Sequence, residues 1–143
     1  MTRIAIASDH HGYMMKSKII KYLTKKNYEV IDLGPDSEES VDYPIFAKKV
    51  GTIVAKGEVE KGILICYTGI GVSIACNRIK GVRCARVVDK MDVKHARVDN
   101  DANIVAFSSE LKMYKVYDII DMFLNTEFSN LERHQRRIKE LDD

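Results

Sequence analysis

The sequence predicts a three-layer, doubly wound α/β fold: a parallel sheet of about five strands, helices on both faces and an extra C-terminal helix. Short apolar runs rich in β-branched residues alternate with longer segments of helical periodicity, which is the pattern of repeated βαβ units. These runs also lack strict alternation of polar and apolar residues. That is expected for parallel strands that helices cover on both faces.

The expected strands are Ile-Ala-Ile-Ala at 4–7, Val-Ile-Asp-Leu at 30–33, Ile-Leu-Ile-Cys at 63–66, the stretch 82–88, and Ile-Val-Ala-Phe at 104–107. The segments between them place apolar residues at helical spacing and predict helices over 13–26, 43–56, 72–79, 91–98 and 111–124, with a charged final helix near 129–141. In such folds ligands bind beyond the carboxyl ends of the strands, so the candidate site residues are sought there.

Length and composition indicate one globular domain over residues 1–143. Hydrophobic residues make up 45% and charged residues 31% of the chain, which excludes the disordered class. The two prolines, Pro35 and Pro44, bracket an acidic loop at 36–42. We interpret this loop as a surface connection and not as a domain linker, because the chain has no Gly/Ser-rich or low-complexity tract.

Charge and cysteine content narrow the class of protein further. A net charge of +2 argues against a nucleic-acid partner. No apolar run approaches the roughly 20 residues that span a bilayer, and the N-terminus turns polar too early for a signal peptide, so we expect no membrane partner and a cytoplasmic protein. Cys66, Cys76 and Cys84 form no CxxC pair and are expected to be free thiols.

The first expected strand ends in Ser8-Asp9-His10-His11-Gly12, with glycine where the chain turns into its helix. This segment presents a carboxylate and an imidazole together at a strand end. A purely structural alternative is that Asp9 caps the helix and the histidines are merely exposed. A metal site formed by Asp9, His10, His11 and Cys66 is a further alternative, but no HxxxH or HxxE spacing supports it.

The third expected strand ends in Cys66-Tyr67-Thr68-Gly69-Ile70-Gly71, a thiol at the start of a glycine-containing loop that opens a helix. Backbone N–H groups of such a loop stabilise an anion, and the helix dipole favours the thiolate, so Cys66 is a candidate base or nucleophile. Alternatively Cys66 is a small buried hydrophobe, as we expect for Cys76 and Cys84. A dinucleotide-binding loop fits poorly, because Ile74 occupies the third glycine position and the turn does not follow the first strand.

Five motifs in this order and spacing resemble those of the type B ribose-5-phosphate isomerase family: Ser-Asp-His-x-Gly at 8–12, Asp42-Tyr43-Pro44, Cys66-x-Thr-Gly-Ile-Gly, Asn100-Asp101-Ala102-Asn103 and Arg133-His134-x-x-Arg137. The resemblance covers essentially the whole chain and implies a Rossmann-like fold, in agreement with the βαβ pattern. The family also includes allose-6-phosphate isomerases and galactose-6-phosphate isomerase subunits.

The resemblance implies aldose–ketose isomerisation without a metal or other cofactor. It makes Cys66 the base that moves a proton between C2 and C1 through an enediolate. The implied oxyanion site consists of N–H groups of the loop Thr68, Gly69, Ile70 and Gly71 together with the Asn100 side chain, and Tyr67 of the same loop is a further substrate-binding residue. The implied phosphate site consists of His10, Arg133 and Arg137. Asp9, Tyr43 and Thr68 would line the sugar and assist ring opening. In the family, dimers complete each site with residues of the partner subunit, so a homodimer or a dimer of dimers is expected.

The chain departs from the family pattern at three positions. Asp99 stands where the family usually has the ring-opening histidine; either Asp99 itself or His95, one helical turn earlier, is the candidate substitute. Tyr67 replaces a glycine, and a positive φ there would strain the loop. Glu110 replaces an arginine that contacts phosphate in many members.

The sequence therefore predicts an isomerase that interconverts ribose 5-phosphate and ribulose 5-phosphate, with a small phosphorylated sugar as its ligand. The alternative is a phosphosugar-binding or subunit-type homologue, or an isomerase of six-carbon sugar phosphates. The preferred sugar cannot be predicted, because the loop residues do not fix the depth of the pocket. The apolar spacing of 113–124 fits core packing as well as a dimer face.

Overall fold

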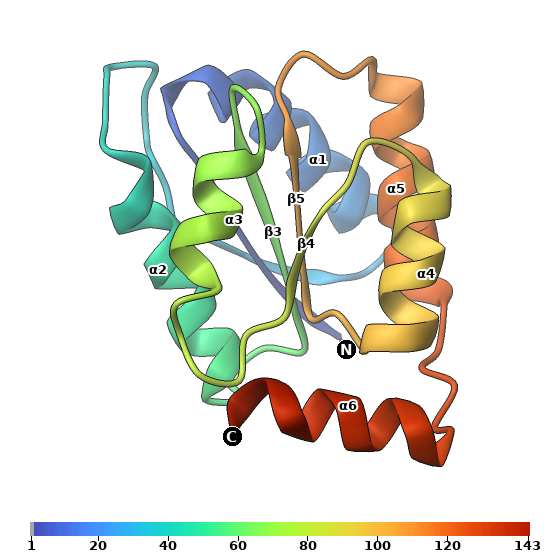
Figure 1. Cartoon of the computed structure of the whole chain (residues 1–143). Coiled ribbons are helices and arrows are strands. Elements are labelled where there is room, and N and C mark those ends of the chain that lie inside the picture. Colours follow the sequence, from blue (N-terminus) through green and yellow to red (C-terminus); the bar gives the residue numbers. More distant parts are fainter. Residues whose placement is uncertain (1) are drawn as a thin grey trace.

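The computed structural model describes residues 2–143, which form a five-stranded parallel sheet between layers of helices (Figure 1). The strands are β1 (Arg3–Ser8), β2 (Glu29–Asp32), β3 (Lys61–Cys66), β4 (Cys84–Arg86) and β5 (Ile104–Ser108). Their order across the sheet is β2-β1-β3-β5-β4, and every neighbouring pair is parallel. The predicted fold class is confirmed.

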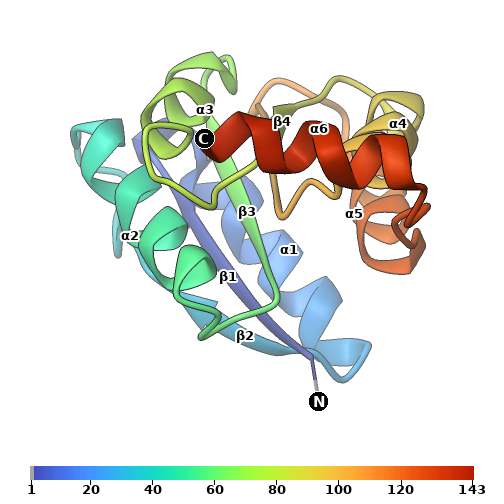
Figure 2. The same ribbon diagram turned by 60° about the horizontal axis from the view of Figure 1, so that its bottom comes forward.

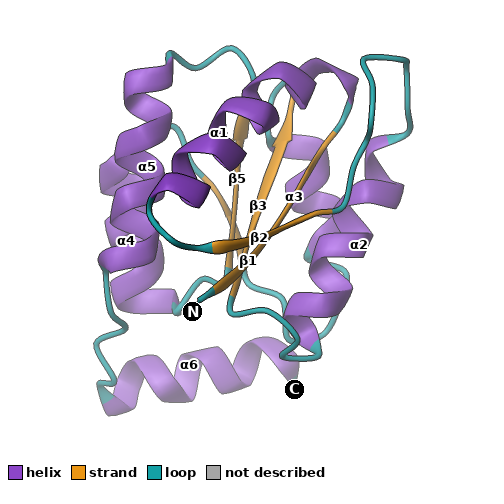
Figure 3. Cartoon of the chain, turned by 180° about the vertical axis from the view of Figure 1, so that it is seen from behind, coloured by secondary structure: helices purple, strands orange, loops and turns teal. Residues whose placement is uncertain are grey.

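The helices are α1 (Tyr13–Lys25), α2 (Tyr43–Ala55), α3 (Ile70–Cys76), α4 (Lys90–Asn100), α5 (Met113–Asn125) and α6 (Glu132–Asp142), and a short 3₁₀ turn, η1 (His10–Gly12), precedes α1. Helices α1, α4 and α5 contribute to the core on one face of the sheet, and α2 and α3 to the core on the other (Figure 3). Helix α6 lies across the end where the strands begin (Figures 1 and 2). Within residues 2–143 no helix has the length and apolar character needed to cross a membrane.

Two cores flank the sheet, and the strands supply both of them. Along β1, Ile4 and Ile6 face the α1 and α5 side, while Ala5 and Ala7 face the α2 and α3 side, and all four are fully buried. Successive side chains of a strand point to opposite faces, so a strand buried on both faces needs apolar residues at every position. This explains the missing polar alternation in the sequence.

The expected strand at 82–88 is the largest difference between sequence and structure, because only Cys84–Arg86 forms β4. Side-chain amides occupy the backbone groups around its start. Asn77 accepts the Cys84 N–H through Oδ1 (2.9 Å) and donates to the Cys84 carbonyl (3.0 Å), and Asn103 Oδ1 accepts the Arg83 N–H (2.8 Å). As the last strand in the order, β4 pairs with β5 alone. Asn103 extends the pairing on the β5 side, whereas the Asn77 amide takes the place of a second neighbouring strand at Cys84.

Candidate active site

The carboxyl ends of β1 and β3 lie side by side and bring Asp9 and Cys66 to one edge of the sheet. The two strands are parallel neighbours with Ser8 opposite Ile65. The Asp9 N–H donates to the Ile65 carbonyl at 3.0 Å, which ties the end of one strand to the other. Asp9 and Cys66 are both buried, with 6% and 5% exposure. The topology alone therefore places a carboxylate and a thiol in the same region.

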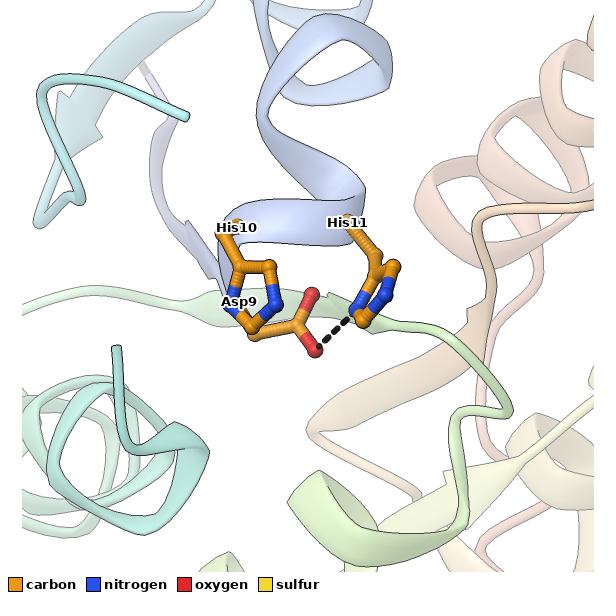
Figure 4. A group of neighbouring side chains, drawn as sticks. All are labelled: Asp9, His10 and His11. Carbon is orange, nitrogen blue, oxygen red and sulfur yellow. Dashed lines mark hydrogen bonds and ion pairs between the residues drawn. The ribbon is translucent and has the colours of Figure 1, made fainter. Parts of the chain in front are cut away.

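Asp9 caps the turn η1 with one carboxylate oxygen and contacts a histidine with the other. Its Oδ1 accepts the Gly12 N–H at 3.1 Å, and its Oδ2 lies 3.3 Å from Nδ1 of His11 (Figure 4). The capping alternative is thus correct for Oδ1. Since that bond fixes the carboxylate, Oδ2 is held in a defined position beside the imidazole.

His10 is held as a hydrogen-bond donor. Its Nδ1 accepts the Val41 N–H at 3.2 Å, and a neutral imidazole that accepts at one nitrogen carries its proton on the other. Ligand atoms of Asp9, His10 and His11 lie within 4.8 Å of one another, close enough to share a metal ion. A protonated Nε2 has no lone pair for a metal, however, so this arrangement suits a negatively charged oxygen better than a cation.

The Cys66 sulfur faces a donor supplied by its own loop. The Gly69 N–H donates to Sγ at 3.1 Å, so the sulfur accepts a backbone hydrogen bond at the mouth of the loop. In the same loop the Thr68 hydroxyl accepts the Ile70 N–H at 3.1 Å. Two of the loop N–H groups expected to face an oxyanion thus already have partners within the chain, and an incoming oxyanion would share or replace them.

The loop conformation depends on Gly69, which has a φ of +77°. A Cβ at this position would lie 2.7 Å from the Cα of Phe107, a backbone atom of β5 that cannot move aside. Tyr67 is not among the residues with positive φ, so the backbone strain that the sequence suggested at this position is absent. Its ring instead lies 5.1 Å from the His11 ring. Tyr43 packs over Gly71, where an added Cβ would approach its ring to 2.6 Å.

Replacing Gly69 with alanine should lower the free energy of unfolding by roughly 2–4 kcal/mol, from the cost of a left-handed backbone plus the collision with Phe107. Gly57→Ala is the matched control, because Gly57 has a similar φ of +74° but an added Cβ there would meet nothing within 4 Å. It should cost only about 1 kcal/mol. Urea denaturation measures both values, and equal losses in the two variants would contradict the close approach to Phe107.

Arg86 is a residue at this edge that the sequence did not single out. It ends β4, and its Nε and Nη2 donate to the Thr68 carbonyl at 3.2 and 3.1 Å. The turn after β5 is bound to the same loop, since Ser108 Oγ donates to the Tyr67 carbonyl at 2.6 Å and accepts the Glu110 N–H at 2.9 Å. Glu110 therefore stands at the carboxyl edge. The sequence could have indicated Arg86, because it is a charged residue at the end of an expected strand.

The other expected site residues lie at the opposite edge of the sheet. Asp99 and Asn100 are the last residues of α4, which begins near the carboxyl edge. Its 11 residues span about 16 Å, so its end lies near the edge where the strands begin. Arg133 and Arg137 are exposed on α6, which crosses the edge where the strands begin (Figure 2). One chain therefore does not bring these four residues to Cys66.

Asp99 has a histidine beside it, but not the one considered from the sequence. His134 of α6 places Nε2 3.8 Å from Asp99 Oδ1. His95 is exposed, and the described part of the chain gives it no hydrogen bond or ion pair. The contact between α4 and α6 was not visible in the sequence, because 35 positions separate the two side chains.

The remaining thiols fit the structural role expected for them. Cys76 is fully buried, and Cys84 is half-buried at the start of β4. A hydrogen bond with Cys76, together with burial, raises the pKa of the Cys84 thiol well above its ordinary value. Cys84 therefore stays neutral at physiological pH, in contrast to what a base requires.

These features define a Rossmann-like α/β protein with a thiol, a carboxylate and an imidazole gathered at the carboxyl edge of its sheet. A family model described as Ribose/Galactose Isomerase matches residues 4–141. The chain belongs to this family, which confirms the resemblance inferred from its motifs.

Individual relatives agree with that assignment. The chain is 39% identical over 142 residues to ribose-5-phosphate isomerase B of Escherichia coli, covering 97% of this chain and 93% of that one. The structure of ribose-5-phosphate isomerase B from Clostridium thermocellum matches with a TM-score of 0.96 at 42% identity, over 99% of this chain and 95% of that one. The Mycoplasma genitalium enzyme with bound ribulose-5-phosphate matches with a TM-score of 0.93 at 40% identity, over 98% and 93%.

Proposed function

We propose that the protein is an aldose–ketose isomerase that interconverts ribose 5-phosphate and ribulose 5-phosphate through an enediolate. The observation that carries the proposal is the Cys66 sulfur, buried at the carboxyl edge with the Gly69 N–H directed at it at 3.1 Å. Family membership and the named relatives support the same reaction. The three free thiols are typical of a reducing compartment, so we assign the enzyme to the cytoplasm.

Cys66 performs the proton transfer in this proposal. As the thiolate it takes the proton from C2 of the open-chain aldose, and the electron pair of that bond forms the enediolate, with the negative charge on O1. The O2 proton passes to O1, and the thiol returns the carbon-bound proton to C1, which leaves the C2 ketone and the thiolate. Asp9, Tyr43 and Thr68 line the sugar. N–H groups of the Thr68–Gly71 loop, with Asn100, stabilise the oxyanion that develops in this step. The chemistry needs no metal, so activity should survive a chelator such as EDTA.

A second copy of the chain completes each site. Arg133 and Arg137 are one helical turn apart on α6 and exposed, as a bidentate phosphate clamp requires, yet they stand at the far edge from Cys66. In a homodimer or a dimer of dimers the partner's far edge would cover the carboxyl edge of the first subunit. Ile70 and Ile74, 48% and 55% exposed on α3, provide apolar surface for such an interface.

A cavity lies beside the edge strand β4. Its volume is about 550 Å³, and its wall includes Asn77, Arg83, Asn100 and Leu141 but not Cys66. Because it joins the end of α3 to the ends of α4 and α6, we infer that a partner subunit covers it and that Asn100 reaches the partner's site from this surface.

Asp99 opens the sugar ring in this proposal. Its carboxylate takes the proton of the anomeric hydroxyl while the bond between C1 and the ring oxygen breaks, and it then hands that proton to the ring oxygen. The carboxylate returns to its ionised state, so the step consumes no proton. The family's histidine performs the same exchange by resemblance, which makes Asp99 a substitution of one acid–base group for another.

The test is conversion of ribose 5-phosphate to ribulose 5-phosphate by the purified protein, with and without EDTA. We expect turnover that is unchanged by EDTA. If only six-carbon sugar phosphates turn over, the substrate assignment is wrong. If sugar phosphates raise the melting temperature without any turnover, the protein is a binding homologue. The first substitution to make would then be at Glu110, because its carboxylate stands at the carboxyl edge where many members of the family have an arginine.

A further inference from the structure

His134 joins the last helix to the end of α4 through a short chain of polar contacts. Its side chain is only 10% exposed. Nδ1 lies 2.7 Å from the hydroxyl oxygen of Ser129, and Nε2 lies 3.8 Å from Oδ1 of Asp99. The hydrogen bond at Nδ1 and the burial of the ring orient the imidazole, with Nε2 on the side of Asp99. Ser129, His134 and Asp99 therefore form a defined row that ends at a half-exposed carboxylate.

The hydrogen bonds of Ser129 are compatible with a row in which His134 donates toward Asp99. The Ser129 oxygen accepts the Leu131 N–H at 3.2 Å and keeps a hydroxyl proton that can donate to Nδ1 of His134. In the tautomer that the proposal requires, the imidazole carries its proton on Nε2, the nitrogen nearer Asp99. At 3.8 Å this contact is longer than a hydrogen bond, so the proposal requires the half-exposed Asp99 side chain to rotate toward Nε2.

We propose that His134 is a positioning residue for ring opening, which fixes the Asp99 carboxylate by donating from Nε2 to Oδ1. The inference rests on the proposed function, in which Asp99 exchanges a proton with the sugar. With Oδ1 held, Oδ2 is the oxygen left for the anomeric hydroxyl of a sugar bound to the partner subunit. Within residues 2–143 no hydrogen bond engages Oδ2, and the Asp99 side chain is 47% exposed.

The arrangement explains how an aspartate can occupy a histidine position. A free carboxylate on a helix end samples several rotamers, and only some of them present an oxygen to the substrate. A buried donor on one oxygen removes that freedom. Ser129 and His134 are supplied by the segment that also carries Arg133 and Arg137, so the phosphate clamp and the ring-opening group are positioned together.

Ring opening is measurable apart from the Cys66 step. Ribose 5-phosphate is mostly a closed ring, whereas ribulose 5-phosphate stays open, because its O5 carries the phosphate and no five-membered ring can form. The conversion of ribose 5-phosphate therefore requires ring opening. Incorporation of deuterium from D₂O at C1 of ribulose 5-phosphate requires only the Cys66 step and the bound phosphate.

The variant His134→Leu removes the donor and keeps an apolar side chain of similar bulk. We expect conversion of ribose 5-phosphate to fall roughly 10- to 100-fold while deuterium exchange into ribulose 5-phosphate stays within about twofold of the wild type. Asp99→Asn should show the same pattern with a larger loss of conversion. His134→Gln keeps an N–H donor and should recover part of the lost conversion.

Controls separate this inference from the proposed function. Arg136→Gln changes an exposed residue of the same helix that pairs with Glu132 and should alter neither readout. If His134→Leu lowers conversion and exchange equally, His134 only holds α6 in place and the inference is overturned. The inference is also overturned if the variant loses neither activity. Should the leucine variant fail to fold, Ser129→Ala carries the same comparison. A wild-type protein without conversion or exchange refutes the proposed function itself.

Discussion

Cys66→Ala should lower the turnover of ribose 5-phosphate by roughly 10³- to 10⁴-fold, the contribution of a well-placed general base. Alanine cannot accept the C2 proton, so deuterium exchange into ribulose 5-phosphate should fall equally. The variant should still fold, because a single sulfur atom is lost from a core position of 5% exposure, at a cost of about 1 kcal/mol. Coupled spectrophotometric assays and NMR of the exchange reaction measure the two activities.

Cys76→Ala is the matched control for this result. Cys76 is fully buried in the same core cluster as Cys66, so its replacement removes the same atom from similar packing and should cost similar stability. Because it lies at the end of α3 and away from the carboxyl edge, turnover should stay near the wild-type rate. Equal activity losses in both variants would trace the effect to packing and would remove Cys66 from its role as the base.

The sequence predicted the parts of this protein that depend on local patterns. Apolar runs identified β1, β2, β3 and β5, and glycines shortly after two of these strands marked the turns next to Asp9 and Cys66. Parallel strands with helical connections put their carboxyl ends at one edge, so these residues were expected together. The structure places them as neighbours because β1 and β3 are paired.

Local patterns did not predict which segments far apart in the sequence contact each other. The side-chain amides of Asn77 and Asn103 bond the backbone at the start of β4. A hydrophobic pattern in the sequence does not reveal such bonds, so the limits of this strand could not be predicted. His95 was considered for ring opening since helical spacing links it to Asp99, whereas His134 reaches Asp99 from another helix. Spacing rules compare residues within one element and do not show which elements cross.

A mixture of two inactive variants should regain activity if each site is shared between subunits. One variant is Cys66→Ala, and the other carries Arg133→Ala together with Arg137→Ala. In a symmetric dimer every mixed pair has one site with both defects and one with neither. Co-expression at equal levels makes half of the dimers mixed, so the sample should reach about a quarter of the wild-type turnover, while each variant alone stays near background.

The combination of Cys66→Ala with Asp9→Asn is the control, because both residues lie at the carboxyl edge of one chain. A mixed pair of these variants carries one defect in each site, so activity should not return. Native mass spectrometry establishes that mixed oligomers are present in both samples. Mixed oligomers without recovered turnover in the first sample would show that Arg133 and Arg137 do not serve the partner's site. The two edges of the chain would then need separate functions, since about 16 Å of α4 lies between them.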